Sequence, residues 1–181
     1  MTQPWIDDVL HFWFAELPPL AWFSGDESTD ALVRMRFLAL HEELRRCLPA
    51  GALLAPESAL AAVIALDQFP RNLYRDRPET YAVDAAALAA AQRAVMLGFD
   101  RAFDKTRRLF FYLPFMHAED RAAQARAVEL CQTLGEGESL VQARWHRAIV
   151  DRFGRFPHRN AILGRSSTAA EIEFLKTRRG F

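Results

Sequence analysis

The sequence predicts an all-α fold of seven to eight helices packed as antiparallel hairpins, in one domain over residues 1–181. Three observations support this prediction. Apolar residues recur at helical spacing along almost the whole chain, no pair of alternating runs is joined by a tight hairpin turn, and the connections between helical segments are short. A chain of 181 residues buries enough apolar surface to fold without disulfides or a metal ion.

The first two helices are indicated by their end signals. The first should begin at Pro4, which a first helical turn tolerates, and end at Pro18–Pro19. Its aromatic run Phe12–Phe14 is too wide for a single apolar stripe, so this helix should be buried on more than one side. The second helix is expected to take Ser28 or Thr29 as its N-cap.

Prolines, glycines and one capping motif limit the later helices. Pro70 and Pro114 should each stop a helix, because proline lacks the backbone donor, and Gly98 and Gly154 should end two others. The spacing of Thr168–Glu171 is a capping box, which indicates the start of a last helix. These signals predict helices over residues 56–69, 84–97, 105–113, 119–134 and 139–153, and a last one from about 169.

Two polar residues interrupt apolar helix faces. Asp67 lies on the stripe that carries Leu60, and His146 lies on the face that carries Ile149. A carboxylate removed from water must find a donor or be neutralised, and bidentate pairing with an arginine such as Arg71 is the expected solution. We therefore expect Asp67 and His146 to meet in the folded protein.

The two loops after these helices resemble each other. Residues Gln68–Asn72 read QFPRN, and residues Arg155–Asn160 read RFPHRN. In each, the proline should end the helix, the phenylalanine should pack into the core, and arginine and asparagine should bond exposed helix carbonyls. A third break, Leu113–Asp120 (LPFMHAED), places a histidine just ahead of two acidic residues that suit the start of a helix.

With these motifs the chain resembles the bacterial domain-of-unknown-function family 924. The stretches that carry the resemblance span nearly the whole chain: Val9–Phe14, Leu66–Asn72, Leu113–Asp120, Arg152–Arg165 and Ser167–Leu175. The resemblance implies a helical fold similar to tetratricopeptide-repeat proteins, and it supplies no activity, substrate or cofactor. The family usually has serine where this chain has Ala118, which counts against serine chemistry there. If that serine caps the following helix, its loss should cost about 1 kcal/mol.

The motif residues define one candidate site. If they converge, arginines outnumber carboxylates, and the cavity favours an anion such as a phosphate or a carboxylate. The candidate ligand-binding residues are Asp67, Arg71, Asn72, His117, Glu119, His146, Arg152, Arg155, His158, Arg159 and Asn160.

Three functions stay open. The first is a helical domain that binds a small anionic ligand, or the carboxylate-bearing part of a peptide, in an Arg/His/Asp-lined pocket. The second is an enzyme that uses Asp67 with His117 or His146 as an acid–base pair, since the unperturbed pKa of histidine is near neutrality. The third is a protein–protein interaction scaffold in which these motif residues are purely structural.

Composition and missing motifs exclude several classes. With 23 basic and 23 acidic residues the chain has no bulk attraction for nucleic acid or an anionic membrane, and we expect neither as a partner. A metal set of His117, Glu119, His146 and His158 lacks ligand spacing and has arginines nearby, so we expect no metal. No dinucleotide-binding or phosphate-loop motif is present, and we expect no cofactor.

Localisation is expected to be cytoplasmic. No basic segment precedes an apolar core at the N-terminus, and the longest apolar stretch is too short to cross a bilayer. Cys47 and Cys131 lie far apart without a CxxC spacing, so each is expected to be a small buried hydrophobe rather than half of a disulfide or a zinc ligand. The sequence leaves the oligomeric state open.

Overall fold

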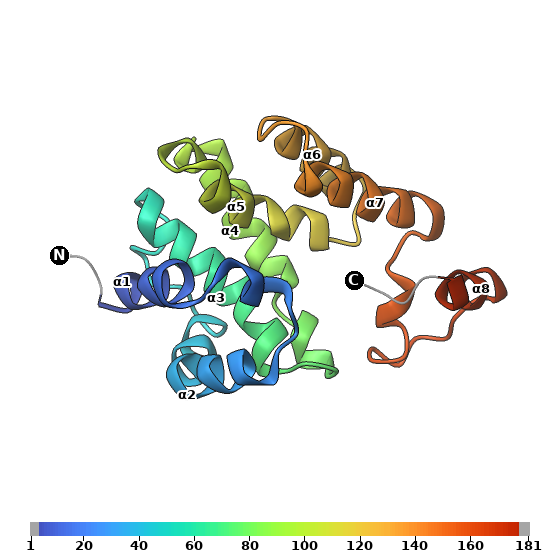
Figure 1. Cartoon of the computed structure of the whole chain (residues 1–181), viewed down its shortest axis with the longest axis horizontal. Helices are drawn as coiled ribbons and strands as arrows, with labels where there is room; N and C mark the ends of the chain where they lie inside the picture. Colours follow the sequence, from blue (N-terminus) through green and yellow to red (C-terminus); the bar gives the residue numbers. More distant parts are fainter. Residues whose placement is uncertain (1–3, 178–181) are drawn as a thin grey trace. The chain divides into compact units, whose positions relative to one another are not determined.

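The computed structural model describes residues 4–177, and all regular structure in that range is helical (Figure 1). This confirms the predicted all-α class. Eight α-helices lie in the described range: α1 (Pro4–His11), α2 (Glu27–Leu44), α3 (Pro56–Leu73), α4 (Asp84–Met96), α5 (Lys105–His117), α6 (Arg121–Gln132), α7 (Glu138–Phe153) and α8 (Ala169–Thr177). Shorter segments are the π-helix η1 (Phe12–Glu16) and the 3₁₀ helices η2 (Pro19–Phe23), η3 (Pro78–Tyr81), η4 (Phe99–Ala102) and η5 (Pro157–Arg159).

The chain forms two compact units. The first comprises Met1–Arg75 and Glu79–Pro114, and the second comprises Asp76–Pro78 and Phe115–Phe181. The expectation of a single domain stays a prediction. Consecutive helices pack in pairs, α2 with α3 and α6 with α7, which is consistent with the tetratricopeptide-repeat-like fold that the resemblance implies. No helix among the described residues is long and apolar enough to span a membrane.

Helix α3 forms the centre of the first unit, because it is apolar on nearly all sides. Every residue from Ser58 to Pro70 is buried, and α1, α2 and α4 pack against this helix (Figure 1). Alanines make up much of this run, and their small side chains allow the neighbouring helices to approach closely. Asp67 therefore has no solvent-facing side to turn to, as its place on the apolar stripe predicts.

The first helix widens into a π-helical turn before it ends. The Leu17 N–H bonds the Phe12 carbonyl at 3.1 Å, five residues back, and the indole N–H of Trp22 bonds the Trp13 carbonyl at 2.8 Å. Phe12 and Trp13 are both buried, so the aromatic run is covered on more than one side, as predicted.

Two of the predicted helix ends are wrong. Pro70 and Pro114 lie inside α3 and α5, which continue to Leu73 and His117. An interior proline removes one backbone bond and costs about 3 kcal/mol. The residues beyond each proline are buried, Leu73 in α3 and Phe115 in α5, and their packing offsets that cost.

The N-caps also differ from the prediction in two helices. Asp26, rather than Ser28 or Thr29, caps α2 by accepting the Ser28 N–H at 3.3 Å. Asp120 caps α6 by accepting the Ala123 N–H at 2.7 Å, so this helix begins at Arg121 instead of 119. A serine at position 118 would precede that N-cap by two residues and would not cap α6.

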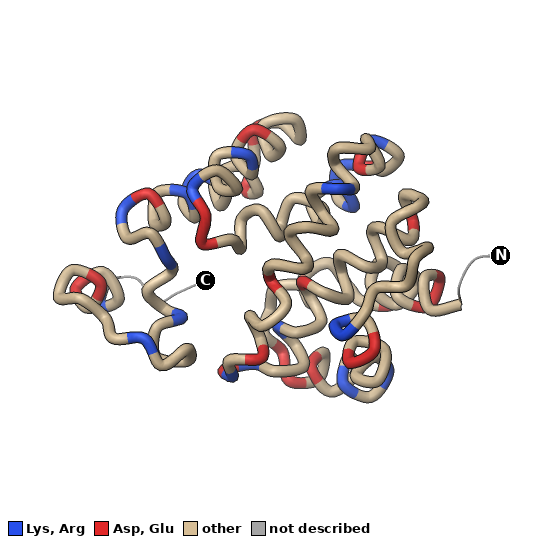
Figure 2. Tube along the Cα trace, turned by 180° about the vertical axis from the view of Figure 1, so that it is seen from behind, with Lys and Arg blue, Asp and Glu red and all other residues tan. Residues whose placement is uncertain are grey.

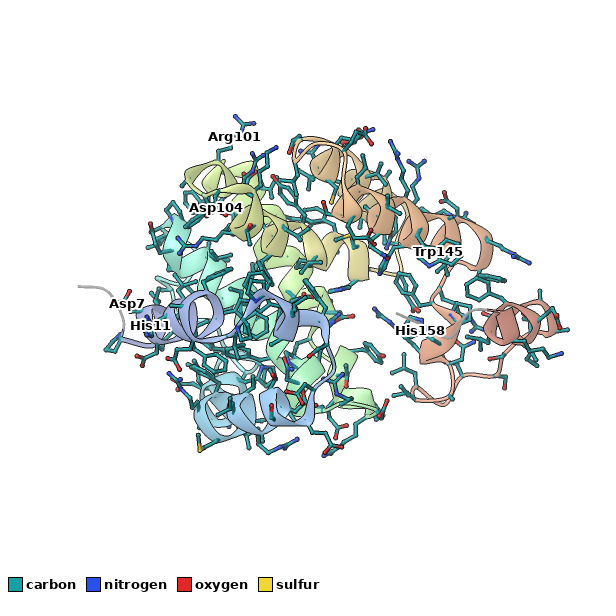
Figure 3. The ribbon with its side chains drawn as sticks, in the orientation of Figure 1. Asp7, His11, Arg101, Asp104, Trp145 and His158 are labelled. Atoms are coloured by element: carbon teal, nitrogen blue, oxygen red, sulfur yellow. The ribbon has the colours of Figure 1, made fainter. Side chains whose placement is uncertain are left out.

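The second unit is built on the α6–α7 pair and on the segment that follows it. Gly154 ends α7 in the left-handed region, with φ 72°, which turns the chain away from the helix axis. Ile149, Val150 and Phe156 form a small core, and Trp145 (labelled in Figure 3), Phe153 and Phe174 pack against it. These contacts place α8 next to the end of α7.

The two cysteines have different environments. Cys131 is buried, as predicted, and burial raises its pKa to about 12. Cys47 is exposed, so the expectation that it is a buried hydrophobe is wrong. It follows the end of α2, in a segment that leaves its side chain open to solvent.

Candidate functional site

The last turns of α3 carry three of the candidate residues. Asp67 is 1% exposed, and its Oδ1 lies 3.5 Å from Arg71 Nη1. Arg71 Nη2 donates to Asp84 Oδ1 at the start of α4 over 3.1 Å, and Asn72 Nδ2 donates to Asp30 Oδ1 of α2 over 2.8 Å. Burial acts to lower the pKa of Arg71, but the charges of Asp67 and Asp84 outweigh it and raise that pKa. Arg71 therefore ties α3 to α4 through an ion pair, and Asn72 ties α3 to α2 through a hydrogen bond.

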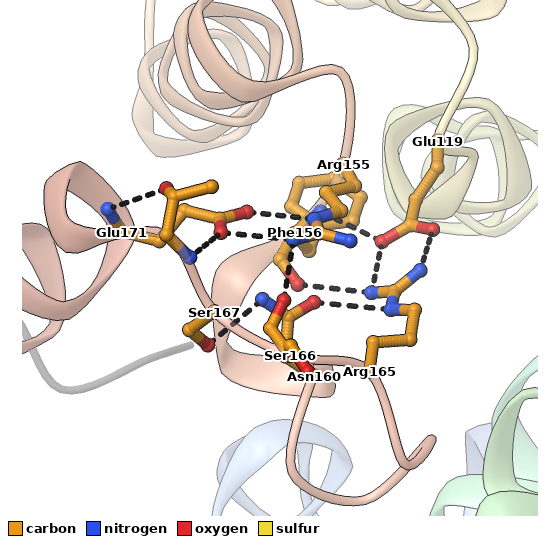
Figure 4. Close-up of polar contacts among 9 residues, drawn as sticks. Glu119, Arg155, Phe156, Asn160, Arg165, Ser166, Ser167 and Glu171 are labelled. Atoms are coloured by element: carbon orange, nitrogen blue, oxygen red, sulfur yellow. Dashed lines mark hydrogen bonds and ion pairs between the residues drawn. The ribbon is translucent and has the colours of Figure 1, made fainter.

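Glu119 accepts three hydrogen bonds in the polar network of the second unit (Figure 4). Its two oxygens accept from Arg165 Nη1 at 2.6 Å and Nη2 at 2.9 Å, and Oε1 also accepts the Phe156 N–H at 2.7 Å. Burial would raise the pKa of Glu119, but the bonds from Arg165 and Phe156 outweigh it and lower that pKa. The prediction that Glu119 serves the start of a helix is replaced by this role in fixing the loop after α7.

A second bidentate pair joins the end of α7 to α8. Arg155 Nε and Nη2 donate to the two oxygens of Glu171 at 2.7 and 2.9 Å, and Nη2 also donates to the Ser166 carbonyl at 2.8 Å (Figure 4). Glu171 Oε2 accepts the Thr168 N–H at 2.7 Å, and Thr168 Oγ1 accepts the Glu171 N–H at 3.3 Å, which confirms the capping box. The bond from Arg155 is the main reason that the pKa of Glu171 falls to about 2.

Asn160 holds the loop between α7 and α8. Its side chain is fully buried, its Nδ2 donates to Ser167 Oγ at 3.0 Å, and its Oδ1 accepts from Arg165 Nε at 3.0 Å. The Arg165 N–H also bonds the Asn160 carbonyl at 2.8 Å. These hydrogen bonds fix the loop between α7 and α8.

The two similar motifs do not form the same turn. Gln68–Asn72 lies within α3, whereas Arg155–Asn160 follows the end of α7 and forms the short η5. The difference lies in the residue before each motif. Gly154 adopts φ 72° and ends α7, while Asp67 continues α3 with its carbonyl bonded by Arg71. The expectation of two copies of one turn is wrong.

His146 and His158 pack against the buried ring of Phe156, and His117 lies next to His146. The centre of the His146 ring lies 5.6 Å from that of Phe156 and 6.4 Å from that of His117, and the His158 ring lies 5.7 Å from Phe156. The Arg159 guanidinium lies 4.8 Å from the centre of the Phe156 ring and donates to the His117 carbonyl at 2.9 Å. The basic candidates near the third motif and in η5 thus come together within the second unit.

His146 and His158 are neutral near pH 7. His146 Nδ1 lies 2.8 Å from the Gln142 carbonyl, which can only accept, so Nδ1 carries the proton. Burial, and then the charges of His117 and Arg159, lower the pKa of His146 to about 3. Burial, and then the charge of Arg159, lower the pKa of His158 to about 4.

A surface pocket of about 520 Å³ lies at the end of α7 and the start of α8. Phe153 and Ala170 supply apolar surface to it. Its lining residues are Arg152, Phe153, Arg155, Thr168, Ala170 and Glu171. Acidic and basic residues are interspersed along this part of the chain (Figure 2), and two of the charged groups here, Arg155 and Glu171, neutralise each other.

Metal binding finds no support in the described part of the chain. Within residues 4–177 no three histidine, cysteine or acidic side chains are grouped so that they could hold a metal ion. Glu119, the carboxylate of the alternative metal set, is bonded to Arg165 and to the Phe156 N–H. An ion pair of this kind would have to break before Glu119 could bind a cation.

The eleven candidate residues are divided between the two units. The first unit holds Asp67, Arg71 and Asn72, and the second unit holds His117, Glu119, His146, Arg152, Arg155, His158, Arg159 and Asn160. The meeting of Asp67 with His146 stays a prediction. Within the second unit, His146, His158 and Arg159 contact Phe156, while Arg152 and Arg155 line the pocket.

Sequence reasoning missed three residues of this region. Arg165 is the partner of Glu119, Glu171 is the partner of Arg155, and Thr168 lines the pocket. The capping-box spacing points to Glu171 and Thr168 only as helix-start residues. Arg165 lies in the stretch Arg152–Arg165 that carries the family resemblance, but nothing in the local sequence indicates which carboxylate it bonds.

Comparisons with known proteins agree on a family without an assigned activity. Residues 9–179 match the family model described as "Bacterial protein of unknown function (DUF924)". The chain is similar to a solved structure of the protein of unknown function ATU0120 from Agrobacterium tumefaciens, with 44% sequence identity, a TM-score of 0.91, and coverage of 96% of this chain and 97% of the other. None of the curated proteins matches the sequence.

Proposed function

The chain belongs to the DUF924 family, and because neither the family description nor the solved relative names a ligand, we propose a function from the site itself: a helical domain that binds a small anionic ligand. The binding place is the pocket at the end of α7 and the start of α8. A free carboxylate and the carboxylate of a peptide are both within this class.

One observation carries the proposal. Arg152 lines the pocket, and no residue between 4 and 177 forms an ion pair with its guanidinium. The guanidinium carbon lies 4.7 Å from the centre of the Phe153 ring, and no hydrogen bond to a residue between 4 and 177 uses its N–H donors. Those donors form a planar fork that matches the oxygens of a carboxylate or a phosphate.

The remaining lining supports a small ligand. A cavity of about 520 Å³ falls in the range of about 300–1,000 Å³ that is usual for small-molecule sites. Phe153 and Ala170 offer apolar contacts beside the charged group. Arg155 is held by Glu171, so it shapes the pocket without bringing an uncompensated charge to it.

The enzyme alternative draws little support from His146, one of its two candidate bases. A general base works best when its pKa is close to the working pH. Burial lowers the pKa of His146 to about 3, so this imidazole is a weak base at pH 7. Binding without chemistry is therefore the function that this geometry favours.

The interaction scaffold is a second candidate, and the ion-pair network favours it. The loop after α7 is held by hydrogen bonds from Arg155, Arg165 and Asn160. If these signature residues are purely structural, the domain presents a rigid surface to another protein and has no small ligand.

A ligand screen separates the two candidates. We would record thermal unfolding of the whole chain with carboxylated and phosphorylated metabolites, for the wild type, Arg152→Gln and Arg144→Gln. A ligand at a hundred times its Kd stabilises the native state by about 2.7 kcal/mol. Arg144 is an exposed arginine earlier on α7 that does not line the pocket, so its variant is the matched control.

Binding at the pocket predicts that a hit raises the melting temperature of the wild type and of Arg144→Gln, and that Arg152→Gln loses the effect. A flat response of the wild type across the screen would overturn the anion-binding function and leave the scaffold.

A further inference from the structure

We infer that the ligand of this pocket is a monocarboxylate with a flat apolar body, rather than a phosphate ester or a dicarboxylate. The inference rests on the proposed anion-binding function and names its ligand class. It follows from three features of the lining: one uncompensated positive charge, guanidinium N–H donors that bond no described residue, and the apolar surface next to them.

The charge of the pocket fits one negative charge. Arg155 and Glu171 form a bidentate pair at 2.7 and 2.9 Å, so together they contribute no net charge. Arg152 is then the one charged group of the lining that is left uncompensated by the described residues. A second negative charge on the ligand would meet the Glu171 carboxylate instead of a second cation, and like charges at short range repel.

The donors of the pocket fit a carboxylate in direction and number. The carbon of the Arg152 guanidinium lies over the Phe153 ring, and its N–H groups bond no described residue, so two of them can form parallel bonds to a carboxylate. Thr168 lines the same pocket, and its hydroxyl accepts the Glu171 N–H at 3.3 Å. Besides the bond from Arg155, a side-chain hydrogen bond from Thr168 also helps to lower the pKa of Glu171, so that carboxylate holds the hydroxyl proton and the ligand's donors come from Arg152.

The surface beside these donors fits a flat apolar group. Phe153 lies 5.2 Å from Phe174, and Phe174 stacks on Trp145 at 6.0 Å, so three rings support one another. Next to Phe153, Ala170 adds a small side chain that leaves room above it. An aromatic ring attached to the ligand's carboxylate would pack against Phe153 and Ala170, as aromatic groups do in offset or edge contacts.

The test compares four probes on the full chain by NMR titration at pH 7.5 and constant ionic strength. Phenylacetate has the single carboxylate and the ring, phenylmalonate adds a second carboxylate, phenyl phosphate replaces the carboxylate, and acetate lacks the ring. We expect phenylacetate to bind about tenfold more tightly than each of the other three, a difference of about 1.4 kcal/mol.

Three variants locate the binding. Arg152→Gln should weaken phenylacetate about tenfold, the lower end of the range for charged hydrogen bonds because the side chain is exposed. Arg152→Lys keeps the charge without the fork and should bind with intermediate affinity. Arg144→Gln should bind like the wild type. Circular dichroism spectra show whether each variant is folded, and both Arg152 variants change an exposed side chain that bonds no described carboxylate or carbonyl.

The possible results have distinct meanings. Arg152-dependent binding of phenyl phosphate or phenylmalonate as tight as that of phenylacetate overturns the monocarboxylate class and leaves anion binding intact. Equal affinity for acetate and phenylacetate overturns the apolar body. Identical behaviour of the wild type and Arg152→Gln with every probe overturns this inference, and a flat metabolite screen is the separate result that removes the proposed function.

Discussion

Replacing Glu119 with glutamine should destabilise the second unit by about 2 kcal/mol at pH 7. The side chain accepts two bonds from Arg165 and one from the Phe156 N–H, which together fix the loop after α7. Glutamine keeps an oxygen for the Phe156 N–H but turns an NH₂ group toward Arg165. The guanidinium then loses its carboxylate while Asn160 still holds it in place.

The magnitude follows from the bonds that are lost. A hydrogen bond to a charged group contributes about 1.5–3 kcal/mol, and two such bonds between Glu119 and Arg165 disappear. The side chains are 23% and 26% exposed, so water compensates part of the loss, and we take about 2 kcal/mol for the pair. In a protein of this length that lowers the melting temperature by about 4–8 °C.

The stability difference between the wild type and Glu119→Gln should also depend on pH, and the lowered pKa of Glu119 determines the direction of that dependence. The native pKa of Glu119 lies below its ordinary value of 4.5, so its contribution to stability is complete above that value and is lost as the pH falls through the native pKa. The gap between the wild type and Glu119→Gln should therefore be full at pH 7 and smaller at pH 3.

Urea denaturation followed by circular dichroism at both pH values measures the gap. Glu173→Gln is the control, because Glu173 pairs with Lys176 at 2.9 Å on the exposed surface of α8, where such pairs contribute about 0.5 kcal/mol or less. If Glu119→Gln costs no more than Glu173→Gln at pH 7, the ion pair does not hold the loop and the reasoning fails.

Three further predictions concern the same unit. The bond from Arg155 lowers the pKa of Glu171 to about 2, so Glu171→Gln should melt below the wild type at pH 7 and at pH 4, and the two should converge only near pH 2; a constant gap at every pH would contradict this. Burial, helped by nearby positive charge, lowers the pKa of His146 to about 3, so the wild type should lose stability as the pH falls from about 6.5, and His146→Phe should show a flatter decline between pH 7 and 4 in thermal melts; parallel declines would count against it. Gly154→Ala places a side chain at φ 72° with no atom within 4 Å of its Cβ, so backbone strain alone should cost about 1 kcal/mol in urea denaturation, while Gly154→Asn should cost less; equal losses for both variants would point to another cause.

The helices could be predicted from the sequence because their apolar residues repeat with the helical period, and burial of that face is the main source of their stability. The ends at Pro70 and Pro114 could not be predicted from local rules. Whether a helix continues past a proline depends on what the next residues pack against, and Leu73 and Phe115 are both buried after the proline. That information lies in the tertiary contacts.

The candidate site could also be predicted only in part. The burial of Asp67 and His146 could be predicted, since each interrupts an apolar face. The partners in the second unit could not, because the Arg165–Glu119 pair joins residues 46 apart in the chain, and no periodic pattern specifies such a meeting. The uncompensated charge of Arg152 becomes visible only once the partners of the other arginines are known.

The π-helical turn at Phe12–Glu16 makes the length of this segment a constraint on how the sequence can vary. A helix rotates by about 100° per residue, so deleting one residue here would restore ordinary α-helical bonding and swing Leu17 out of its buried position. With a residue between Trp13 and Leu17 removed, the position four residues after Trp13 would be Pro18, which has no N–H, so the Trp13 carbonyl would still depend on the Trp22 indole. Relatives that retain both tryptophans are therefore expected to preserve the spacing between them, and to accept substitutions in this stretch more readily than deletions.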